Sequence, residues 1–227
     1  MERVYEVKTT RDDNSMKVGR EWLSISDMMS GLMMVFLFIG VSLMMEVQKK
    51  EIVIKDIKAE LDKELNKEFA NKFKEWGIEE VKDNIFRFNA PDVNFEVNKD
   101  IVTDSFKVIL SEFFPKYIEI LTSEKYKNYV QEIRIEGHTD SGFSNAITKN
   151  DGYIHNIDLS QRRSKNVLSF LSELEAFKNN ELFIKEKVRV NGVGSAVAII
   201  NQDTQEEDII LSRRVDFKVI IMDKVQK

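Results

Sequence analysis

One uncharged, apolar run stands out in the hydropathy pattern of the chain. It extends from Met28 to Met45 and contains no Asp, Glu, Lys or Arg. As a helix, Leu23 to Met45 would span roughly 34 Å at about 1.5 Å per residue, enough to cross a hydrocarbon core of about 30 Å. The run is apolar on every side, unlike a core helix, and ends without a signal-peptide cleavage pattern. The pattern therefore predicts one uncleaved transmembrane helix over 23–45.

After Met45, apolar residues recur at three- and four-residue steps, which is the period of an amphipathic helix. This apolar stripe consists of Ile54, Ile57, Leu61, Leu65, Phe69, Phe73 and Trp76. Gly77 suits the end of such a helix, because glycine readily adopts the left-handed conformation found there. The stripe is not a regular heptad, so two alternatives stay open. The helix packs on its own domain, or it forms a stalk or parallel helix pair that rises from the membrane.

Residues 78–227 show strand and helix patterns in turn. Strands are predicted where apolar and polar residues alternate, at 84–88, 93–97, 130–136, 188–193 and 214–221. One helix is predicted at 103–121, which Pro115 should kink or divide, and another at 160–174 with Ser160 as its N-cap. This succession of strands and helices predicts an α+β domain with a mixed sheet.

The chain is thus expected to contain a tail, a transmembrane helix, an amphipathic helical linker and one α+β domain. Their expected ranges are 1–22, 23–45, 46–77 and 78–227. Five basic and five acidic residues balance each other in 1–22, and Lys is also abundant beyond the span. The positive-inside rule therefore does not orient the helix.

Composition narrows the function classes. The 227 residues carry a formal net charge of −5, with a pI of about 5.3, so no basic footprint for nucleic acid is visible and no such partner is expected. The absence of Cys excludes disulfides and thiolate metal sites. The two His do not form a cluster with other ligand types, so neither a metal nor another cofactor is expected.

Asp27 is the charged residue immediately before the apolar run. On a helix, Ser30 and Gly31 lie on the same face as Asp27, and small residues let a neighbouring helix approach closely. A carboxylate at the edge of a membrane helix is costly unless it has a partner or a function. From the residues alone two interpretations stay open. Asp27 projects into a helix–helix contact, or it is an N-cap at the headgroup boundary.

Several short motifs follow one another in the C-terminal part. They are Gly137-His138-Thr139-Asp140, the stretch from Asn156 through Leu159-Ser160 to Arg163, Gly192-Val193-Gly194, and Ser212-Arg213-Arg214-Val215. In this order the set resembles the OmpA-like peptidoglycan-binding domain, which also occurs in MotB-type stator proteins. The resemblance implies a ligand similar to the diaminopimelate of a peptidoglycan stem peptide, which carries an ammonium group and carboxylates.

The resemblance also implies the binding residues. Asp140 matches the acid that binds the ammonium group, and Arg163 matches the arginine whose planar fork binds a carboxylate. The other expected contributors are Thr139, Leu159 and Arg162. Backbone N–H groups at a helix start near Leu159–Ser160 would favour an anion nearby. The alternative for this motif is an internal salt bridge between Asp and Arg.

Some positions depart from the family pattern. The loop from Asp140 to Leu159 is expected to be longer than usual, Ser195 stands where the family often has Glu, and Ser212 replaces the usual Asn. His138 and His155 are interpreted as hydrogen-bonding loop residues rather than metal ligands.

One span followed by such a domain resembles the B subunit of a proton-driven stator. In that family a Trp precedes an Asp, and here Trp22 leads to Asp27-Met28-Met29-Ser30. The resemblance makes Asp27 and Ser30 the ion-carrying residues. It implies a homodimer of this chain inside a five-subunit ring of multi-span MotA-like or ZorA-like A subunits. It places the protein in the bacterial inner membrane, with the N-terminus in the cytoplasm and the C-terminal domain bound to peptidoglycan in the periplasm.

The short tether, the long loop at Gly137-His138-Thr139-Asp140 and the Ser-Arg-Arg-Val ending resemble the stator of Zorya-type anti-phage defence systems more than flagellar MotB. The flagellar motor stator is therefore the alternative function. A third possibility is a passive protein that tethers the membrane to peptidoglycan, in which Asp27 carries no ion. None of these is an enzyme. A carboxylate alone does not select its ion, so coupling to protons and coupling to sodium both stay open.

Overall fold

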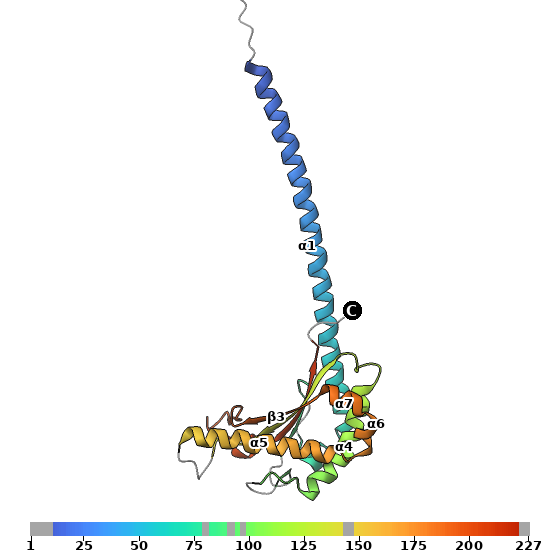
Figure 1. Ribbon diagram of the computed structural model, residues 1–227, viewed down its shortest axis with the longest axis vertical. Helices are drawn as coiled ribbons and strands as arrows, with labels where there is room; N and C mark the ends of the chain where they lie inside the picture. Colours follow the sequence, from blue (N-terminus) through green and yellow to red (C-terminus); the bar gives the residue numbers. More distant parts are fainter. Residues whose placement is uncertain (1–10, 79–81, 90–93, 96–98, 143–147, 223–227) are drawn as a thin grey trace, which may run out of the picture. The chain divides into compact units, whose positions relative to one another are not determined.

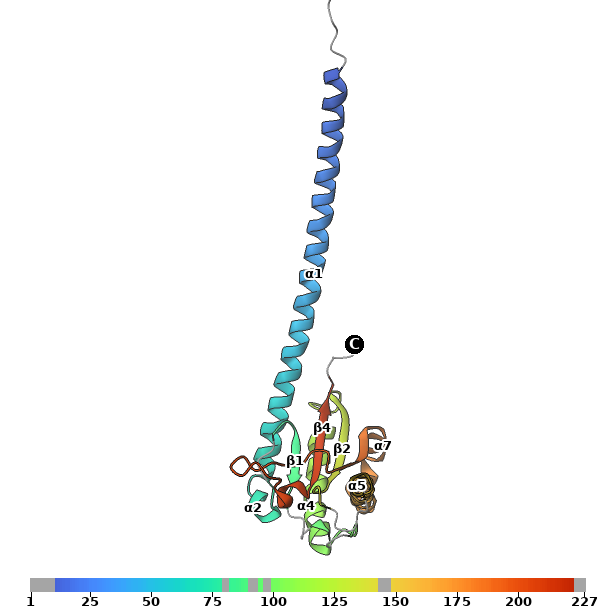
Figure 2. The same ribbon diagram turned by 90° about the vertical axis from the view of Figure 1, so that its left-hand side faces the viewer.

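The computed structural model describes residues 11–78, 82–89, 94–95, 99–142 and 148–222, and it divides into two compact units, 1–51 and 52–227. In the first unit α1 (Arg11–Phe69) is one continuous helix that extends on into the second unit (Figures 1 and 2). Its most apolar 18-residue window has a mean hydropathy of 2.2, and none of it is buried. By length and composition this helix can cross a membrane, as the sequence predicts.

The beginning of α1 lies within the expected polar tail at 1–22. The chain is helical from Arg11 onward. Asp27 therefore lies well inside a helix, where its neighbours already make intrahelical hydrogen bonds. The interpretation of Asp27 as an N-cap is wrong. Residues 1–10 lie outside the described part of the chain.

The apolar stripe of the amphipathic segment packs inside the second unit. Leu61, Leu65 and Phe69 are almost completely buried, and Ile54 and Trp76 are nearly so. After Phe69 the chain turns into α2 (Phe73–Trp76), which Gly77 ends at φ 63°, in the left-handed region. The helix thus packs on its own domain from Ile54 onward, which is the first of the two alternatives.

A four-stranded mixed sheet forms the centre of the second unit. Its strands are β1 (Ile85–Phe88), β2 (Val130–His138), β3 (Val188–Gly194) and β4 (Val215–Ile221). The order across the sheet is β1-β4-β2-β3, with β2 and β3 parallel and the other pairs antiparallel (Figure 2). The predicted α+β class and mixed sheet are confirmed. Most of the strand predicted at 93–97 lies outside the described residues.

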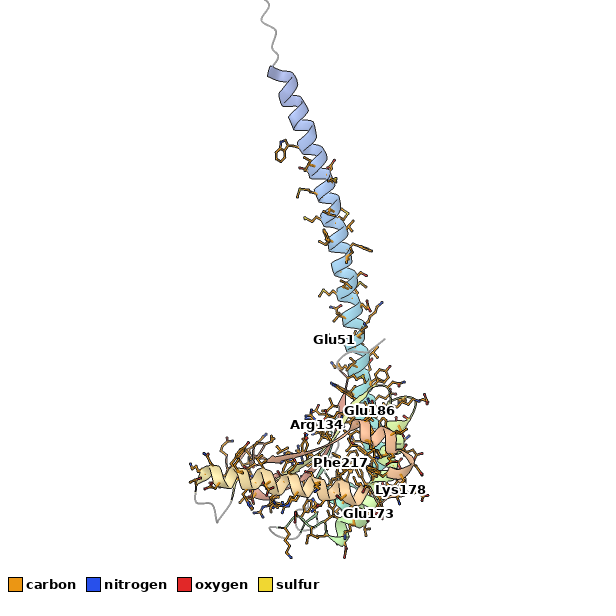
Figure 3. The ribbon with its side chains drawn as sticks, in the orientation of Figure 1. Glu51, Arg134, Glu173, Lys178, Glu186 and Phe217 are labelled. Carbon is orange, nitrogen blue, oxygen red and sulfur yellow. The ribbon has the colours of Figure 1, made fainter. Side chains whose placement is uncertain are left out.

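The core lies between this sheet, α4 (Asp104–Thr122) and the end of α1. Its centre is aromatic. The centroid of the Phe113 ring lies within 5.3 Å of the ring centroids of Phe69, Phe86 and Phe217. Phe217 is buried in the middle of the domain (Figure 3). Pro115 lies inside α4, which is one helix from Asp104 to Thr122, so the expected division of the helix is wrong. The buried residues around Pro115 hold the helix against the sheet, which offsets a proline cost of roughly 3 kcal/mol.

Helix α5 (Lys149–Leu171) begins eleven residues before the predicted start. Thr148 is its N-cap and forms a capping box with Asp151. The prediction of Ser160 as N-cap is wrong, because the Ser160 hydroxyl donates to the Ile157 carbonyl and accepts from the Gly194 N–H. The expected long loop from Asp140 to Leu159 is also wrong, since its second half is helical. Three short helices complete the unit: α6 (Glu175–Asn179), α7 (Glu181–Lys187) and α8 (Ile209–Ser212).

Replacement of Gly192 by alanine is expected to lower the melting temperature of the protein. Helix α5 runs alongside β3 (Figure 1), and a Cβ at Gly192 would lie 2.6 Å from the Gln161 backbone nitrogen. Overpacking of about 1–3 kcal/mol corresponds to a decrease of roughly 5 °C in a domain of this size. Thermal unfolding in detergent measures this decrease. Gly142→Ala, whose Cβ would meet its nearest neighbour at 3.4 Å, is the control, and equal melting temperatures for the two variants would contradict the prediction.

Candidate functional site

Asp140 is held at the end of β2, two residues beyond the strand. It is 4% exposed, and its Oδ1 accepts a hydrogen bond from the Gly142 N–H at 3.1 Å. Its backbone carbonyl accepts from the Asn156 side chain of α5 at 3.1 Å. The preceding residue, Thr139, donates its N–H to the carbonyl of Gly194, the last residue of β3, at 3.0 Å. Strand, turn and helix therefore fix the position of this carboxylate before any ligand arrives.

The second oxygen of Asp140 is bound within the protein. Arg213 donates from Nε to Asp140 Oδ2, and its Nη2 pairs with the same oxygen. The Arg213 side chain is 44% exposed, whereas that of Asp140 is only 6% exposed. The internal salt bridge considered from the sequence therefore exists, with Arg213 as the partner.

Arg163 projects from α5 with its guanidinium oriented by two contacts. Nε donates to the Lys99 carbonyl at 2.9 Å, and the guanidinium carbon lies 4.9 Å from the centroid of the Phe95 ring. Burial, with the charge of Arg213 next in importance, lowers the pKa of Arg163 to about 10, while the charge of Asp140 opposes the shift. The group stays charged at neutral pH. In the described part of the chain its Nη1 and Nη2 have no hydrogen-bond partner, so this edge of the fork is available to a carboxylate.

The other predicted residues lie in different surroundings. Thr139 is 4% exposed, and its hydroxyl has no hydrogen-bond partner among the residues described. Leu159 is buried on α5. Arg162 is exposed and pairs with Asp158 and with Asp100, the latter at 3.1 Å. Two carboxylates other than that of Asp140 therefore already balance the charge of Arg162.

The expected anion site at a helix start near Leu159–Ser160 is wrong. Helix α5 begins at Lys149, so the backbone N–H groups at Leu159 and Ser160 belong to the helix interior. The residues that sequence reasoning missed are Phe95, which stacks on Arg163, and Asn156, which binds the Asp140 backbone. The asparagine was visible as the first residue of the quoted motif. Phe95 had no local signal, because its contact joins distant parts of the sequence.

His138 is the last residue of β2 and is 3% exposed. Asp216 and Glu136 approach its Nε2 at 3.5 and 3.9 Å, yet neither ring nitrogen has a hydrogen-bond partner within the described ranges. Burial, with Arg214 next in importance, lowers the pKa of His138 to about 3. The expectation of a hydrogen-bonding loop residue is wrong for His138. His155 lies in α5 rather than in a loop.

Acidification is expected to destabilise the domain partly through His138. An unfolded His has a pKa of about 6.5, whereas the folded pKa is about 3. Between these values the unfolded state binds more protons, so the free energy of unfolding falls as the pH falls, by up to about 1.4 kcal/mol per pH unit. Urea unfolding of His138→Asn should show a shallower pH dependence than the parent protein across this window. Parallel curves would contradict the assignment.

The membrane-helix pair Asp27 and Ser30 lies on one face of α1. The Ser30 hydroxyl donates to the Ser26 carbonyl at 2.8 Å, one turn earlier. Asp27 is exposed in this single chain and has no hydrogen-bond or ion-pair partner among the described residues. A Cβ at Gly31 would meet nothing within 4 Å. The face around Asp27 is therefore open to a neighbouring helix.

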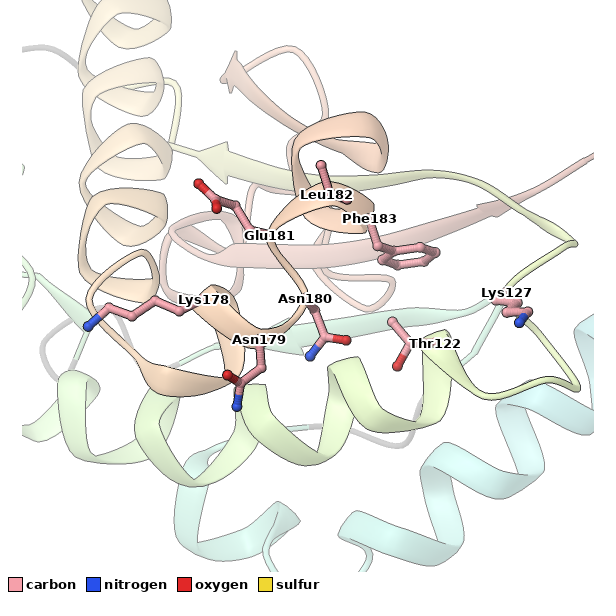
Figure 4. Close-up of a pocket in the computed structure, with 8 residues that line it drawn as sticks. All are labelled: Thr122, Lys127, Lys178, Asn179, Asn180, Glu181, Leu182 and Phe183. Carbon is pink, nitrogen blue, oxygen red and sulfur yellow. The ribbon is translucent and has the colours of Figure 1, made fainter.

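A separate pocket lies in the C-terminal domain. It has a volume of about 450 Å³ and is lined by the end of α4, the turn before β2, and α6 and α7 (Figure 4). Lys127, Lys178 and Glu181 are its charged residues. None of the predicted binding residues lines this pocket.

Comparison with known proteins places the chain in its family. A model of the OmpA family matches residues 94–209. The Zorya protein ZorB of Escherichia coli is 34% identical over 216 residues, which cover 92% of this chain and 91% of that protein. The chain belongs to the ZorB proteins and to the OmpA family. Because the ZorB match covers nearly the whole chain, it includes both Asp27 and Arg163.

Solved structures similar to this ZorB-family chain include a cell wall anchor and a MotB periplasmic domain. The cell wall anchor of the T6SS from Pseudomonas aeruginosa has a TM-score of 0.45 and 17% identity, covering 70% of this chain and 97% of that one. The periplasmic domain of Helicobacter pylori MotB has a TM-score of 0.42 and 14% identity, covering 64% and 84%.

Proposed function

We propose that this chain is the B subunit of an ion-driven rotary stator in a Zorya-type anti-phage defence system, anchored to peptidoglycan by its C-terminal domain. The 34% identity to Zorya protein ZorB across 92% of the chain supports the choice of system. One observation carries the proposal. A single chain joins an apolar helix, whose Asp27 has no partner among the described residues, to an OmpA-family domain that holds Asp140 and Arg163 in fixed positions. The proposed role is that of a stator component and not of an enzyme.

The proposed topology follows from the location of peptidoglycan outside the inner membrane. The tail at 1–22 then lies in the cytoplasm, the helix at 23–45 crosses the membrane once, and the domain at 78–227 is periplasmic. The segment 46–77 links them. Its residues from Ile54 onward pack within the folded domain, so the free tether between membrane and domain is short. A short tether transmits a force from the membrane helix to the wall with little slack.

The proposed ligand is the diaminopimelate part of a stem peptide. Asp140 binds its ammonium group, and the open edge of Arg163 binds a carboxylate through two parallel hydrogen bonds. Thr139 offers an unpaired buried hydroxyl beside Asp140, and Leu159 supplies apolar contact. Arg162 contributes only at the rim, because two carboxylates already neutralise it.

The proposed ion carrier is Asp27, with Ser30 one turn away. Two copies of this chain would present their Asp27 faces to a ring of five MotA-like or ZorA-like A subunits. A charge that crosses a potential of about 100 mV gains roughly 2.3 kcal/mol. Protonation and deprotonation of Asp27 change its charge, and with it the fit of the helix to the surrounding ring. Repeated changes of this kind can turn the ring against a wall-anchored B subunit.

A complementation experiment tests the choice of system. Cells that carry the gene for this chain with its neighbouring genes are challenged with phage and scored for swimming. Protection without restored motility supports the defence stator. Restored motility in a strain without flagellar stators would favour the flagellar alternative. Wall attachment that persists without either phenotype would favour a passive tether.

A further inference from the structure

Both carboxylate oxygens of Asp140 already have partners within the domain. Gly142 donates to one oxygen of the carboxylate, and Arg213 takes the other with two nitrogens. An ammonium group that binds Asp140 needs the same Oδ2, because the carboxylate is nearly buried. Arg213 and such a ligand therefore compete for one position.

The segment that carries Arg213 is fastened close to Asp140 by a second contact. Glu207 accepts from the Ser141 N–H at 3.1 Å and also from the Ser141 hydroxyl. Ser141 directly follows Asp140, and Glu207 lies six residues before Arg213. Two polar contacts thus join the turn after β2 to the segment 207–213.

The base of this segment is itself well ordered. Asp208 caps the short helix α8 by accepting from the Leu211 N–H at 3.0 Å. The Ser212 hydroxyl accepts from the Ile199 N–H at 2.9 Å and is fully buried. The backbone before Arg213 is therefore fixed, whereas the Arg213 side chain is 44% exposed. The side chain can leave Asp140 by a change of rotamer, with no unfolding of α8.

Arg213 also acts on the second half of the site. Its positive charge lowers the pKa of Arg163, second to burial, whereas the negative charge of Asp140 raises it. A ligand ammonium group on Asp140 would neutralise the negative charge that favours charged Arg163. A ligand carboxylate bound by the two arginines would replace that negative charge.

We propose that Arg213 is a displaceable internal cation that makes the site selective for ligands with both an ammonium group and a carboxylate. This inference rests on the proposed wall-binding function. Exchange of one cation for another on Asp140 gains little by itself. The gain comes from the ligand carboxylate, which meets Arg163 and the released Arg213 together. A ligand with an ammonium group but no carboxylate must displace Arg213 without gaining a contact with Arg163 and the released Arg213.

The experiment compares two probes on the full-length protein in detergent. One is a muramyl tripeptide that ends in diaminopimelate, and the other is the same peptide ending in cadaverine, which keeps the free amine and lacks both carboxylates of diaminopimelate. Calorimetric titration gives the ratio of the affinity for the diaminopimelate probe to the affinity for the cadaverine probe. In Arg213→Gln the cadaverine probe no longer has a competing cation, so we expect this ratio to fall about tenfold, which equals about 1.4 kcal/mol.

Two controls keep the result specific to Arg213. Arg213→Lys retains a displaceable cation and should keep a ratio close to that of the parent protein. Lys165→Gln removes an exposed cation of the same helix, α5, that takes no part in the site, and it should leave the ratio unchanged. The Nε–H signal of Arg213 in a ¹⁵N spectrum should move when the tripeptide is added, which a purely structural arginine would not show.

The outcomes separate the inference from the function beneath it. Binding of the tripeptide that depends on Asp140, together with an unchanged ratio in Arg213→Gln, would overturn the inference alone. An equal loss of affinity for both probes in that variant would also overturn the inference, since Arg213 would then only stabilise the structure of the site. If neither the parent protein nor Asp140→Asn binds the tripeptide, the wall-binding function fails, and the inference fails with it.

Discussion

Cells that carry Asp27→Asn should lose phage protection completely, to the level of cells without the system. Asparagine has nearly the shape of aspartate but cannot take up or release a proton at neutral pH. If Asp27 carries the ion, each transfer step is lost and the ring cannot turn. Plating efficiency of phage on cells with the complete gene cluster measures the effect.

The controls show whether the loss is one of ion transfer. Asp27 has no partner within the described residues of its own chain, so the substitution should leave folding and the thermal stability of the C-terminal domain unchanged. Co-purification with the A subunit should also be unchanged. Asp27→Glu keeps a carboxylate and should retain part of the protection, whereas Ser42→Ala, near the other end of the apolar run, should retain all of it. Full protection by Asp27→Asn would eliminate the ion-carrier role and leave a passive tether.

Patterns that depend on neighbouring residues were sufficient for most of the fold. The apolar run predicted the exposed part of α1, and the stripe that ends at Trp76 predicted a helix whose apolar face is buried. The four strands of the sheet were visible as alternation, because each has one face toward the core. Gly77 ends its helix in the left-handed conformation, as its position suggested.

Features that depend on distant contacts were not predictable in this way. Ser160 looks like an N-cap in sequence, but it is a buried helix residue whose hydroxyl binds the Gly194 N–H across to β3. Pro115 looks like a helix breaker, yet the packing of α4 against the sheet outweighs its local cost. In both cases tertiary packing overrides a local preference, and no short window of the sequence contains the partner.

The candidate site shows the same division. Asp140 and Arg163 could be assigned because each belongs to a motif with a recognisable local pattern. The partner of Asp140 could not, since Arg213 lies 73 residues away in sequence and its own motif is equally compatible with a structural role. The sequence thus predicts Asp140 and Arg163 as the binding pair. It did not predict that another arginine, Arg213, holds the Asp140 carboxylate.

Asp140→Asn is expected to weaken binding of the diaminopimelate tripeptide by roughly 10- to 150-fold. Asparagine can still accept from the Gly142 N–H, so the turn after β2 keeps its shape, but the charge that attracts the ligand ammonium is gone. A hydrogen bond to a charged group contributes about 1.5–3 kcal/mol, which corresponds to this range of affinities. Calorimetry with the soluble tripeptide and co-sedimentation with purified cell walls measure the effect.

Arg163→Lys tests the other half of the same site. Lysine keeps the positive charge but not the planar fork, so a bidentate contact with the carboxylate becomes a single one. The expected loss is about tenfold, or roughly 1.4 kcal/mol. Asp140→Ala combined with Arg163→Ala should remove the protein from sedimented walls. Lys165→Gln is the matched control, because Lys165 is exposed on the same helix and takes no part in the site. Unchanged sedimentation of the double variant would show that the motif no longer binds the wall in this chain, and the stator would then need another anchor against its own torque.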